Sequence, residues 1–171
     1  MNIIFLDIDG VLNSGEFAER HYKETSKGLF MYDFLDPSAV DSMKKFLDKH
    51  PDIRLVISSS WRYGDVHKTI DFFGGNGMST LAGYVIGITP RLYSGERGKE
   101  IQCFMKHIGT DVIGDLIIDN DIKVDRYVIV DDDDFDMLGF QKENHLVKID
   151  SRYGITNNDY DKIEKILYGT Y

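Results

Sequence analysis

The stretch Phe5-Leu-Asp-Ile-Asp-Gly-Val-Leu12 carries the strongest signal in the chain. An apolar run from Asn2 to Leu6 ends in two aspartates two residues apart, Asp7 and Asp9, and a glycine follows them. An apolar run of this length predicts a strand that is buried on both faces, as in a parallel sheet. Residues i and i+2 of a strand share a face, so the two carboxylates can converge on one site, and Gly10 lets the chain turn sharply there.

A second acidic group follows another apolar run. Tyr127 to Val130 is typical of a buried strand, and four aspartates come directly after it. Ligands of parallel sheets bind beyond the carboxyl ends of the strands, so the first two of these aspartates are expected to face the first acidic pair. The last two are expected in a solvated loop. Carboxylate oxygens near a phosphate favour Mg²⁺, and the predicted metal-binding residues are Asp7, Asp9, Asp131 and Asp132.

Hydroxyl and cationic side chains complete the candidate site. The run Ile53 to Ser58 is expected to be a strand, and a cluster of serines and an arginine follow its apolar part. A hydroxyl at a strand end can hydrogen-bond to a phosphoryl oxygen. Two basic residues stand where a helix over 98–108 is expected to begin, and a cation beside a helix terminus can hold a phosphate. The candidate phosphate-binding residues are therefore Ser58, Ser59, Arg62, Arg97 and Lys99, with each serine and each of the last two cations as alternatives.

The remaining pattern alternates strands with helices, which predicts an α/β fold with a parallel sheet. Further strands are expected at 84–88 and 145–149, a short helix after residue 65 and a loop at 74–77. A helix is expected over Pro37 to Lys49, with Asp36 as its N-cap, and a last helix is expected after a capping box at Thr156 to Asp159.

Two segments do not follow this alternation. The segment 13–36 is polar with aromatic residues and is expected to form a small flap. The segment 109–126 is long for a connection between a helix and a strand, and its apolar residues predict a small hairpin or an extra strand.

Composition narrows the class of protein. The 171 residues are the usual size of one domain, and we expect residues 1–171 to form a single domain. The net charge of −9 argues against broad, nonspecific binding of nucleic acid, although a local basic groove is compatible with it. No apolar stretch reaches the length of a membrane helix and the N-terminus does not resemble a signal peptide, so a cytoplasmic protein without membrane contact is expected. The lone Cys103 is interpreted as a structural thiol.

In chain order, the four elements resemble the four motifs of the haloacid dehalogenase (HAD) superfamily. The first motif is matched by Asp7 and Asp9, the second by Ser59 or Ser58, the third by Lys99 or Arg97, and the fourth by Asp131 and Asp132. Ser-Ser-Trp-Arg at 59–62, Arg-Gly-Lys-Glu-Ile at 97–101 and Val-Ile-Val-Asp-Asp-Asp at 128–133 resemble one branch of it. That branch is the small HAD domain of Swiss army knife RNA repair proteins. The resemblance covers nearly the whole chain. It implies a Rossmann-like three-layer sandwich with strand order 5-4-1-2-3, a minimal cap and phosphatase activity.

The resemblance also implies roles for individual residues. Asp7 would be the nucleophile that forms an aspartyl-phosphate, and Asp9 would protonate the leaving oxygen and then activate water. Mg²⁺ would be held by Asp7, the backbone carbonyl of Asp9 and the pair Asp131 and Asp132. A serine of the second motif and a cation of the third would bind the phosphoryl oxygens.

The substrate is less constrained. A short flap implies an open site, which suits a bulky substrate such as a polynucleotide end or a protein. The flap residues that could contact it are Arg20, His21, Tyr22, Lys23 and Lys27. One alternative is a nucleotidase or small-metabolite phosphatase. Two alternatives belong to another class of protein. One is a phospho-acceptor binding module, but such a module would not need the second acid, Asp9. The other is a catalytically silent interaction domain on the same fold. The oligomeric state is not predicted.

Overall fold

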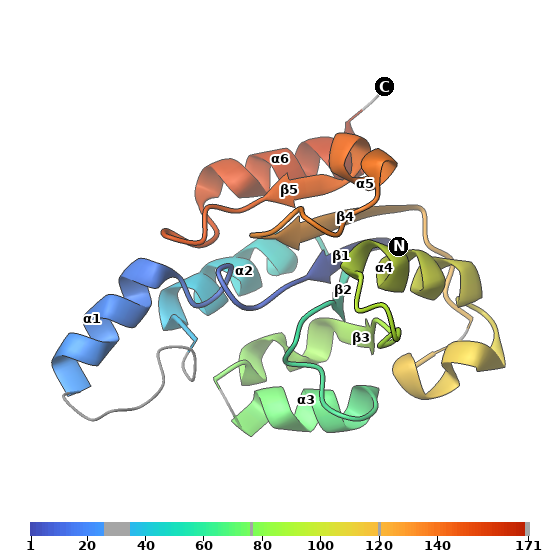
Figure 1. Cartoon of the computed structure of the whole chain (residues 1–171), viewed down its shortest axis with the longest axis horizontal. Coiled ribbons are helices and arrows are strands. Elements are labelled where there is room, and N and C mark those ends of the chain that lie inside the picture. The colour runs from blue at the N-terminus through green and yellow to red at the C-terminus, as the bar shows by residue number, and fades with distance from the viewer. Residues whose placement is uncertain (26–34, 76, 120, 170–171) are drawn as a thin grey trace.

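The computed structural model describes residues 1–25, 35–75, 77–119 and 121–169. Within these ranges five strands form one parallel sheet in the order β3-β2-β1-β4-β5 (Figure 1). The strands are β1 (Asn2–Leu6), β2 (Ile53–Ile57), β3 (Val85–Ile88), β4 (Arg126–Asp131) and β5 (Leu146–Lys148). This is the predicted order 5-4-1-2-3 read from the opposite edge, so both the sheet and its order are confirmed.

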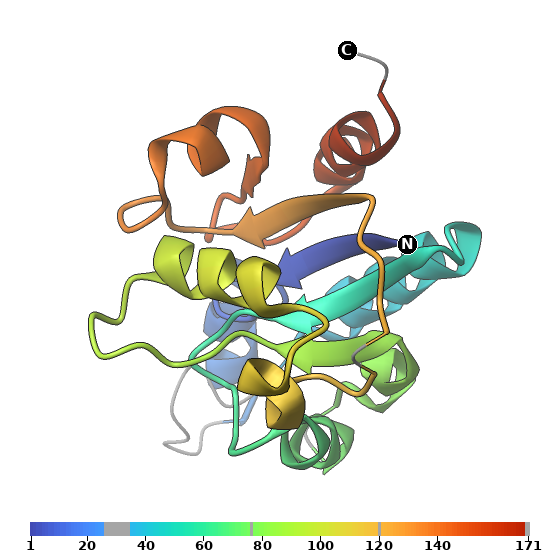
Figure 2. The same cartoon turned by 90° about the vertical axis from the view of Figure 1, so that its right-hand side faces the viewer.

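Helices cover both faces of the sheet, which confirms the three-layer α/β sandwich. The α-helices are α1 (Gly15–Thr25), α2 (Pro37–Lys49), α3 (Val66–Gly75), α4 (Arg97–His107), α5 (Gly139–Asn144) and α6 (Asn157–Tyr168), and the 3-10 helices are η1 (Ser79–Tyr84) and η2 (Asp111–Leu116). Helices α2, α3 and α6 contribute to the core on one face, and α4 and η2 contribute to the core on the other. Figure 2 shows α4 in front of the strands, with the strand arrows all pointing to the same side.

The central strand β1 explains why its sequence is apolar without alternation. Ile4 and Leu6 belong to the core cluster beneath α2 and α6, whereas Ile3 and Phe5 belong to the cluster beneath α4. Phe5 meets Phe104 of α4 edge to face at 5.6 Å between ring centroids. Each such side chain contributes about 1.5–3 kcal/mol when it is fully buried, so this strand holds the two layers together.

The helix signals read from the sequence are confirmed where they rest on capping. Asp36 accepts a hydrogen bond from the backbone N–H of Ser38 at 2.8 Å, and α2 has the predicted bounds. At the start of α6 the backbone N–H of Thr156 donates to the carboxylate of Asp159 at 3.0 Å. A side-chain cap fixes a helix start because it satisfies a backbone group that the helix leaves without a partner.

Other expectations were wrong. The segment 109–126 forms no hairpin among its described residues: it contains η2, and Ile117 makes an isolated antiparallel bridge to Gly87 of β3. Ile113 and Ile117 turn inward against α4, because η2 packs beside that helix, whereas Val112 and Ile118 are exposed. Gly74 and Gly75 close α3 instead of standing in a loop. The short polar helix α5 was not predicted. The predicted flap begins with α1, and residues 26–34 of it lie outside the described residues, as does residue 76 of the predicted loop.

Among the described residues, no helix combines the length and the apolar character that crossing a membrane requires.

Candidate active site

The two acidic motifs meet because β1 and β4 are neighbouring strands that end at the same level of the sheet. Leu6 pairs with Val130 in the parallel register, and the backbone N–H of Asp7 donates to the carbonyl of Val130 at 2.9 Å. The next residues of both strands therefore emerge side by side. Asp7, Asp131 and Asp132 each offer a carboxylate oxygen, and these oxygens all lie within 4.8 Å of one another. Asp7 and Asp131 are buried, and Asp132 is half-buried.

The loop after β1 must be free of side-chain bulk at one position. Gly10 has a φ of +71°, and a Cβ atom built there would lie 2.3 Å from Oδ2 of Asp132. A larger residue would therefore combine a left-handed backbone with a direct clash against the acidic group. Gly10 allows both the turn and the approach of Asp132.

Two of these three carboxylates lie beside a positive charge, that of Arg97 at the start of α4. Its Nη1 atom lies 3.3 Å from Oδ1 of Asp7 and 3.8 Å from Oδ2 of Asp131. Burial raises the pKa of Asp7, and the Arg97 charge opposes that rise. Burial and the nearby charge of Asp7 raise the pKa of Asp131 to about 8, and the same two causes raise the pKa of Asp132.

This donor set fits a divalent cation. Two of the three carboxylates pair with the guanidinium of Arg97, and when ionised the three acids and this cation carry a net charge of −2, which a bound divalent cation would balance. The donors are all oxygens, which Mg²⁺ prefers, and they come from two adjacent strand ends that fix their spacing. Asp9 contributes no carboxylate oxygen to this group among the described residues, so its predicted role as a metal ligand would rest on its backbone carbonyl.

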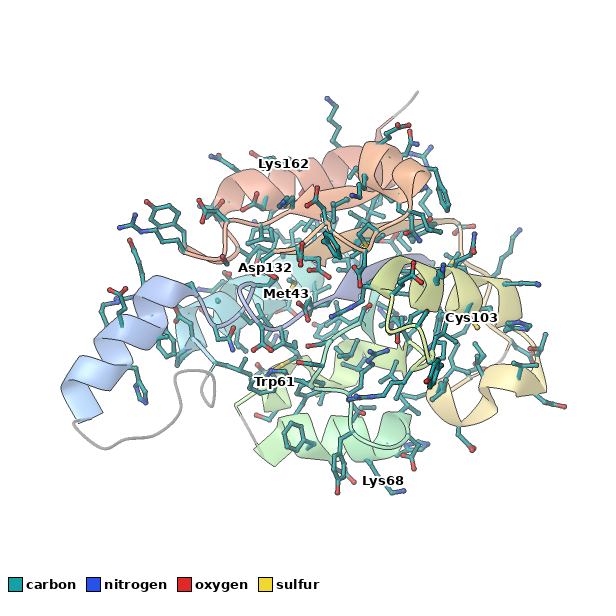
Figure 3. The ribbon with its side chains drawn as sticks, in the orientation of Figure 1. Met43, Trp61, Lys68, Cys103, Asp132 and Lys162 are labelled. Carbon is teal, nitrogen blue, oxygen red and sulfur yellow. The ribbon has the colours of Figure 1, made fainter. Side chains whose placement is uncertain are left out.

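Asp9 faces a different set of partners. Its Oδ1 atom accepts hydrogen bonds from the indole Nε1 of Trp61 at 2.9 Å and from the amide Nδ2 of Asn13 at 2.8 Å. Its Oδ2 atom accepts from the hydroxyl of Ser60 at 3.2 Å. Figure 3 labels Trp61 and Asp132, which lie on the loops that follow β2 and β4. Asp9 is thus held by neutral donors from two segments.

The hydroxyl groups of the two candidate serines, Ser58 and Ser59, have different partners. The hydroxyl of Ser59 hydrogen-bonds to Asp7 and lowers the pKa of that carboxyl, against the larger effect of burial. Ser58 is also buried, but its hydroxyl lies 3.5 Å from the hydroxyl of Thr89. The structure therefore places the hydroxyl of Ser59 at Asp7 and that of Ser58 beside Thr89.

The two candidate cations of α4 also differ. Arg97 contacts Asp7, as described above. Lys99 pairs instead with Glu96 at 2.5 Å, and its side chain is about half exposed. Because residues two apart on a helix point to different sides, the two cations cannot both face the site.

Arg62 is buried and directs its guanidinium at protein groups. Nε donates to the carbonyl of Ser59 at 2.7 Å, and Nη1 donates to the carbonyl and hydroxyl of Thr89 and to the carbonyl of Pro90. Nη2 pairs with the buried carboxylate of Glu100 at 2.9 Å. The arginine thus ties the loop after β2 to α4 and to the loop after β3.

Several residues of the site were not singled out from the sequence. Asn13 and Ser60 are ordinary loop residues in their sequence context, and no signal marks them as partners of Asp9. Glu100 offered a signal that was overlooked: it precedes Ile101 on the buried side of a helix, and a buried acid requires a cationic partner.

The structure describes the side chains of only some of the flap residues that were predicted to contact the substrate. The Nε of Arg20 donates to the carbonyl of Glu16 at 3.4 Å, and the ring of His21 stacks on Phe17. The side chains of Tyr22 and Lys23, and Lys27 as a whole, lie outside the described residues.

The parallel sheet, with an acidic group at its carboxyl edge, is consistent with an HAD-type core. Residues 3–160 match the family model described as the HAD domain in Swiss Army Knife RNA repair proteins, and because the match covers most of the chain, the chain belongs to that family. HAD domains are generally hydrolases of the phosphatase type. A search of curated proteins and a search of solved structures each returned no match.

Proposed function

We propose that this protein is a Mg²⁺-dependent phosphohydrolase that works through an aspartyl-phosphate on Asp7. The observation that carries the proposal is the environment of Asp7. It is a buried carboxylate with a hydroxyl, a guanidinium and two further carboxylates around it. A carboxylate that is to attack a phosphate dianion needs positive charge nearby and donors for the phosphoryl oxygens, and these residues supply both with the metal.

In the proposed reaction, a carboxylate oxygen of Asp7 forms a bond to phosphorus while the bond to the leaving oxygen breaks. Asp9 gives its proton to the leaving oxygen, and later takes a proton from the water that attacks the aspartyl-phosphate, which restores Asp7 and releases phosphate. Ser59 and Arg97 bind the phosphoryl oxygens. Bound Mg²⁺, held by Asp7, Asp131 and Asp132, would offset the repulsion between carboxylate and phosphate.

We assign the third motif to Arg97, because Arg97 contacts Asp7 whereas Lys99 pairs with Glu96. We assign the second motif to Ser59. Arg62 then supports the loop that carries Ser59 and does not bind phosphate itself.

The decisive test is phosphate release from p-nitrophenyl phosphate with and without Mg²⁺, in the wild-type protein and in Asp7→Asn. We expect release to require Mg²⁺ and to fall at least about a thousandfold in the variant. Asp133→Asn is the matched control, since it removes one charge from an exposed residue of the neighbouring loop and should keep most of the activity. Full activity of Asp7→Asn would refute the assignment.

We further propose that the substrate is a bulky phosphate end, such as that of an RNA or DNA strand. The family is described from RNA repair proteins, and the chain segments around the site are too short for a large cap. Tyr63, on the loop that carries Ser59, is 61% exposed and stacks on Phe72 at 5.9 Å between ring centroids. Aromatic rings of this kind can stack on nucleobases.

The substrate proposal is tested with a panel of mononucleotides and of RNA and DNA oligomers that carry a 3′ or a 5′ phosphate. Tyr63→Ala should raise KM for the preferred oligomer at least about fivefold, since a stacked base is worth about 1 kcal/mol or more. KM for p-nitrophenyl phosphate should not change. A preference for free mononucleotides or other small phosphates would favour the nucleotidase or metabolite alternative, and Mg²⁺ binding without any phosphate release would favour a binding module.

A further inference from the structure

The carboxylate of Asp9 is oriented by side chains of the two loops that follow β1 and β2. Two N–H donors, Nε1 of Trp61 and Nδ2 of Asn13, converge on the same oxygen, Oδ1. The direction of the Asn13 amide is itself fixed, because its Oδ1 accepts the backbone N–H of Gly10 at 2.9 Å. The NH₂ side of that amide must therefore point at Asp9.

The indole of Trp61 is also fixed. Its ring stacks on the fully buried ring of Phe73, at 6.3 Å between centroids and 17° between planes, and it meets Phe72 at 6.2 Å. Both phenylalanines belong to α3, so the helix after β2 holds the ring from behind. An indole packed in this way cannot turn its N–H away from Asp9 without losing these contacts.

The two oxygens of Asp9 are consequently not equivalent. A carboxylate oxygen has two lone pairs, and both lone pairs of Oδ1 face N–H groups. Neither the indole nor the amide NH₂ can accept a proton at this position. Among the described residues, the partner of Oδ2 is the hydroxyl of Ser60 alone, and a hydroxyl can rotate to accept instead of donate.

We propose that Trp61 is a positioning residue for Asp9, which with Asn13 reserves Oδ1 for N–H donors and leaves Oδ2 to exchange the proton with the leaving group. The proposal rests on the proposed function, in which Asp9 is the general acid. Trp61 then acts through Asp9 and does not itself contact the reacting atoms. The cluster gives the tryptophan of the Ser-Ser-Trp-Arg segment a chemical task beside its packing.

The substrate series separates this role from simple packing. An alkyl phosphate has a strongly basic leaving oxygen and needs the proton of Asp9, whereas p-nitrophenolate leaves without it. Trp61→Phe keeps an aromatic ring against Phe73 but removes the N–H. We expect formation of the aspartyl-phosphate, followed in single turnovers, to slow about tenfold or more with the alkyl phosphate and less than about threefold with the aryl phosphate.

Phe72→Leu is the matched control, because it changes the packing of the Trp61 ring and leaves the N–H in place. It should slow both substrates to the same extent or leave both unchanged. Equal slowing of both substrates by Trp61→Phe, or no slowing of either, would overturn the proposal.

A second measurement does not depend on turnover. Trp61 is the single tryptophan in the chain, so its indole N–H gives one assignable signal in a ¹H–¹⁵N correlation spectrum. We expect this signal to shift in Asp9→Ala. In Phe72→Leu, which leaves the hydrogen bond to Asp9 in place, the shift should be smaller. An indole signal that is unmoved by Asp9→Ala would overturn the contact itself. A wild-type protein without Asp7-dependent phosphate release would instead overturn the proposed function, so the two failures are distinguishable.

Discussion

Asp7 and Asp9 belong to one short loop, and the structure surrounds them with opposite kinds of partner. Asp7 lies among charges: two carboxylates within 4.8 Å and the guanidinium of Arg97. Asp9 lies among neutral donors, which are an indole, an amide and a hydroxyl. The chain leaves β1 after Leu6 and turns at Gly10, so the two side chains reach different neighbours although only Ile8 lies between them.

The difference fits the different steps that we propose for these two identical side chains. The guanidinium of Arg97, together with a bound divalent cation, would favour the anionic form of Asp7 that the proposed attack on phosphorus needs, against the rise in its pKa that burial causes. The carboxylate of Asp9 is held by neutral donors, two of which fix one oxygen and leave the other to the hydroxyl of Ser60, and the proposed acid–base role uses this arrangement. The fold creates the asymmetry by placing β4 and α4 beside Asp7, and the loop after β2 beside Asp9.

The largest expected effect separates the two aspartates by step. Asp7→Asn should prevent any covalent phosphoryl-enzyme, whereas Asp9→Asn should allow its formation from an aryl phosphate but slow its hydrolysis about 10²–10⁴-fold. Mass spectrometry of acid-quenched protein should therefore detect phosphorylated chain in Asp9→Asn and none in Asp7→Asn. Accumulation in Asp7→Asn would reverse the assignment of the two residues.

The next effect tests which cation belongs to the charged side of the comparison. Arg97→Ala should lower kcat/KM about 10²–10³-fold, because it removes a donor aimed at the developing phosphoryl charge. Lys99→Ala removes an equal charge from the same helix and should change kcat/KM by no more than about twofold, since exposed ion pairs contribute little. Steady-state kinetics with p-nitrophenyl phosphate checks both variants. Similar losses in the two would show that net charge on α4 matters and the contact with Asp7 does not.

Metal binding should also distinguish the two surroundings through stability. Mg²⁺ should raise the free energy of unfolding by about 1–3 kcal/mol near saturation. Asp131→Asn should lose most of this gain, and Asp9→Asn should keep it, because the carboxylate of Asp9 is not part of the acidic group. Thermal unfolding with Mg²⁺ and with EDTA measures the gain. Loss of the Mg²⁺ effect in Asp9→Asn would show that the carboxylate of Asp9 also takes part in metal binding.

Asp131→Asn also tests a pH dependence that we expect of the metal-free protein. Burial and the charge of Asp7 raise the pKa of Asp131 from 3.8 to about 8. A folded-state pKa above the unfolded value means that ionisation opposes folding, so stability in EDTA should fall as the pH rises from about 4 towards about 8. Asp131→Asn should flatten this fall. An unchanged pH profile in the variant would contradict the assigned cause.

Much of the fold could be predicted because its signals are local. The apolar run of β1 and the caps at Asp36 and Thr156 each fix an element through neighbouring residues. The segment 109–126 was predicted wrongly because its apolar residues carry no periodicity, and their burial is decided by α4 packing above them. Helix α5 is too short to show an apolar stripe.

The acidic positions of the site could be predicted because strand ends gather at one edge of a parallel sheet. The direction of each side chain could not. Whether Arg97 or Lys99 faces Asp7 depends on where α4 begins, and a shift of one residue would rotate both. The partners of Asp9 come from Asn13 and Trp61, which are far apart in sequence and meet only after β1 and β2 pair.

The smallest expected effect takes the comparison away from the site, to a carboxylate that is held by donors and has no catalytic task. Asp159 accepts hydrogen bonds from the backbone and hydroxyl of Thr156 and from Lys162. Burial alone would raise the pKa of Asp159, but these hydrogen bonds outweigh it and lower that pKa. Asp159→Asn should lower the free energy of unfolding by about 1 kcal/mol at neutral pH, while Asp161→Asn, at an exposed position of the same helix, should not.

The sign of the pH dependence follows from the direction of that shift. A depressed folded-state pKa gives stability that is fully present above the ordinary value of 3.8 and is lost as the pH falls through the folded-state value. Urea unfolding of the wild type and of Asp159→Asn should therefore differ at pH 7 and converge in strong acid. A difference that persists in acid would mean that Asp159 stabilises the start of α6 through packing. The hydrogen bonds that its charged form accepts from Thr156 and Lys162 would then not be the cause.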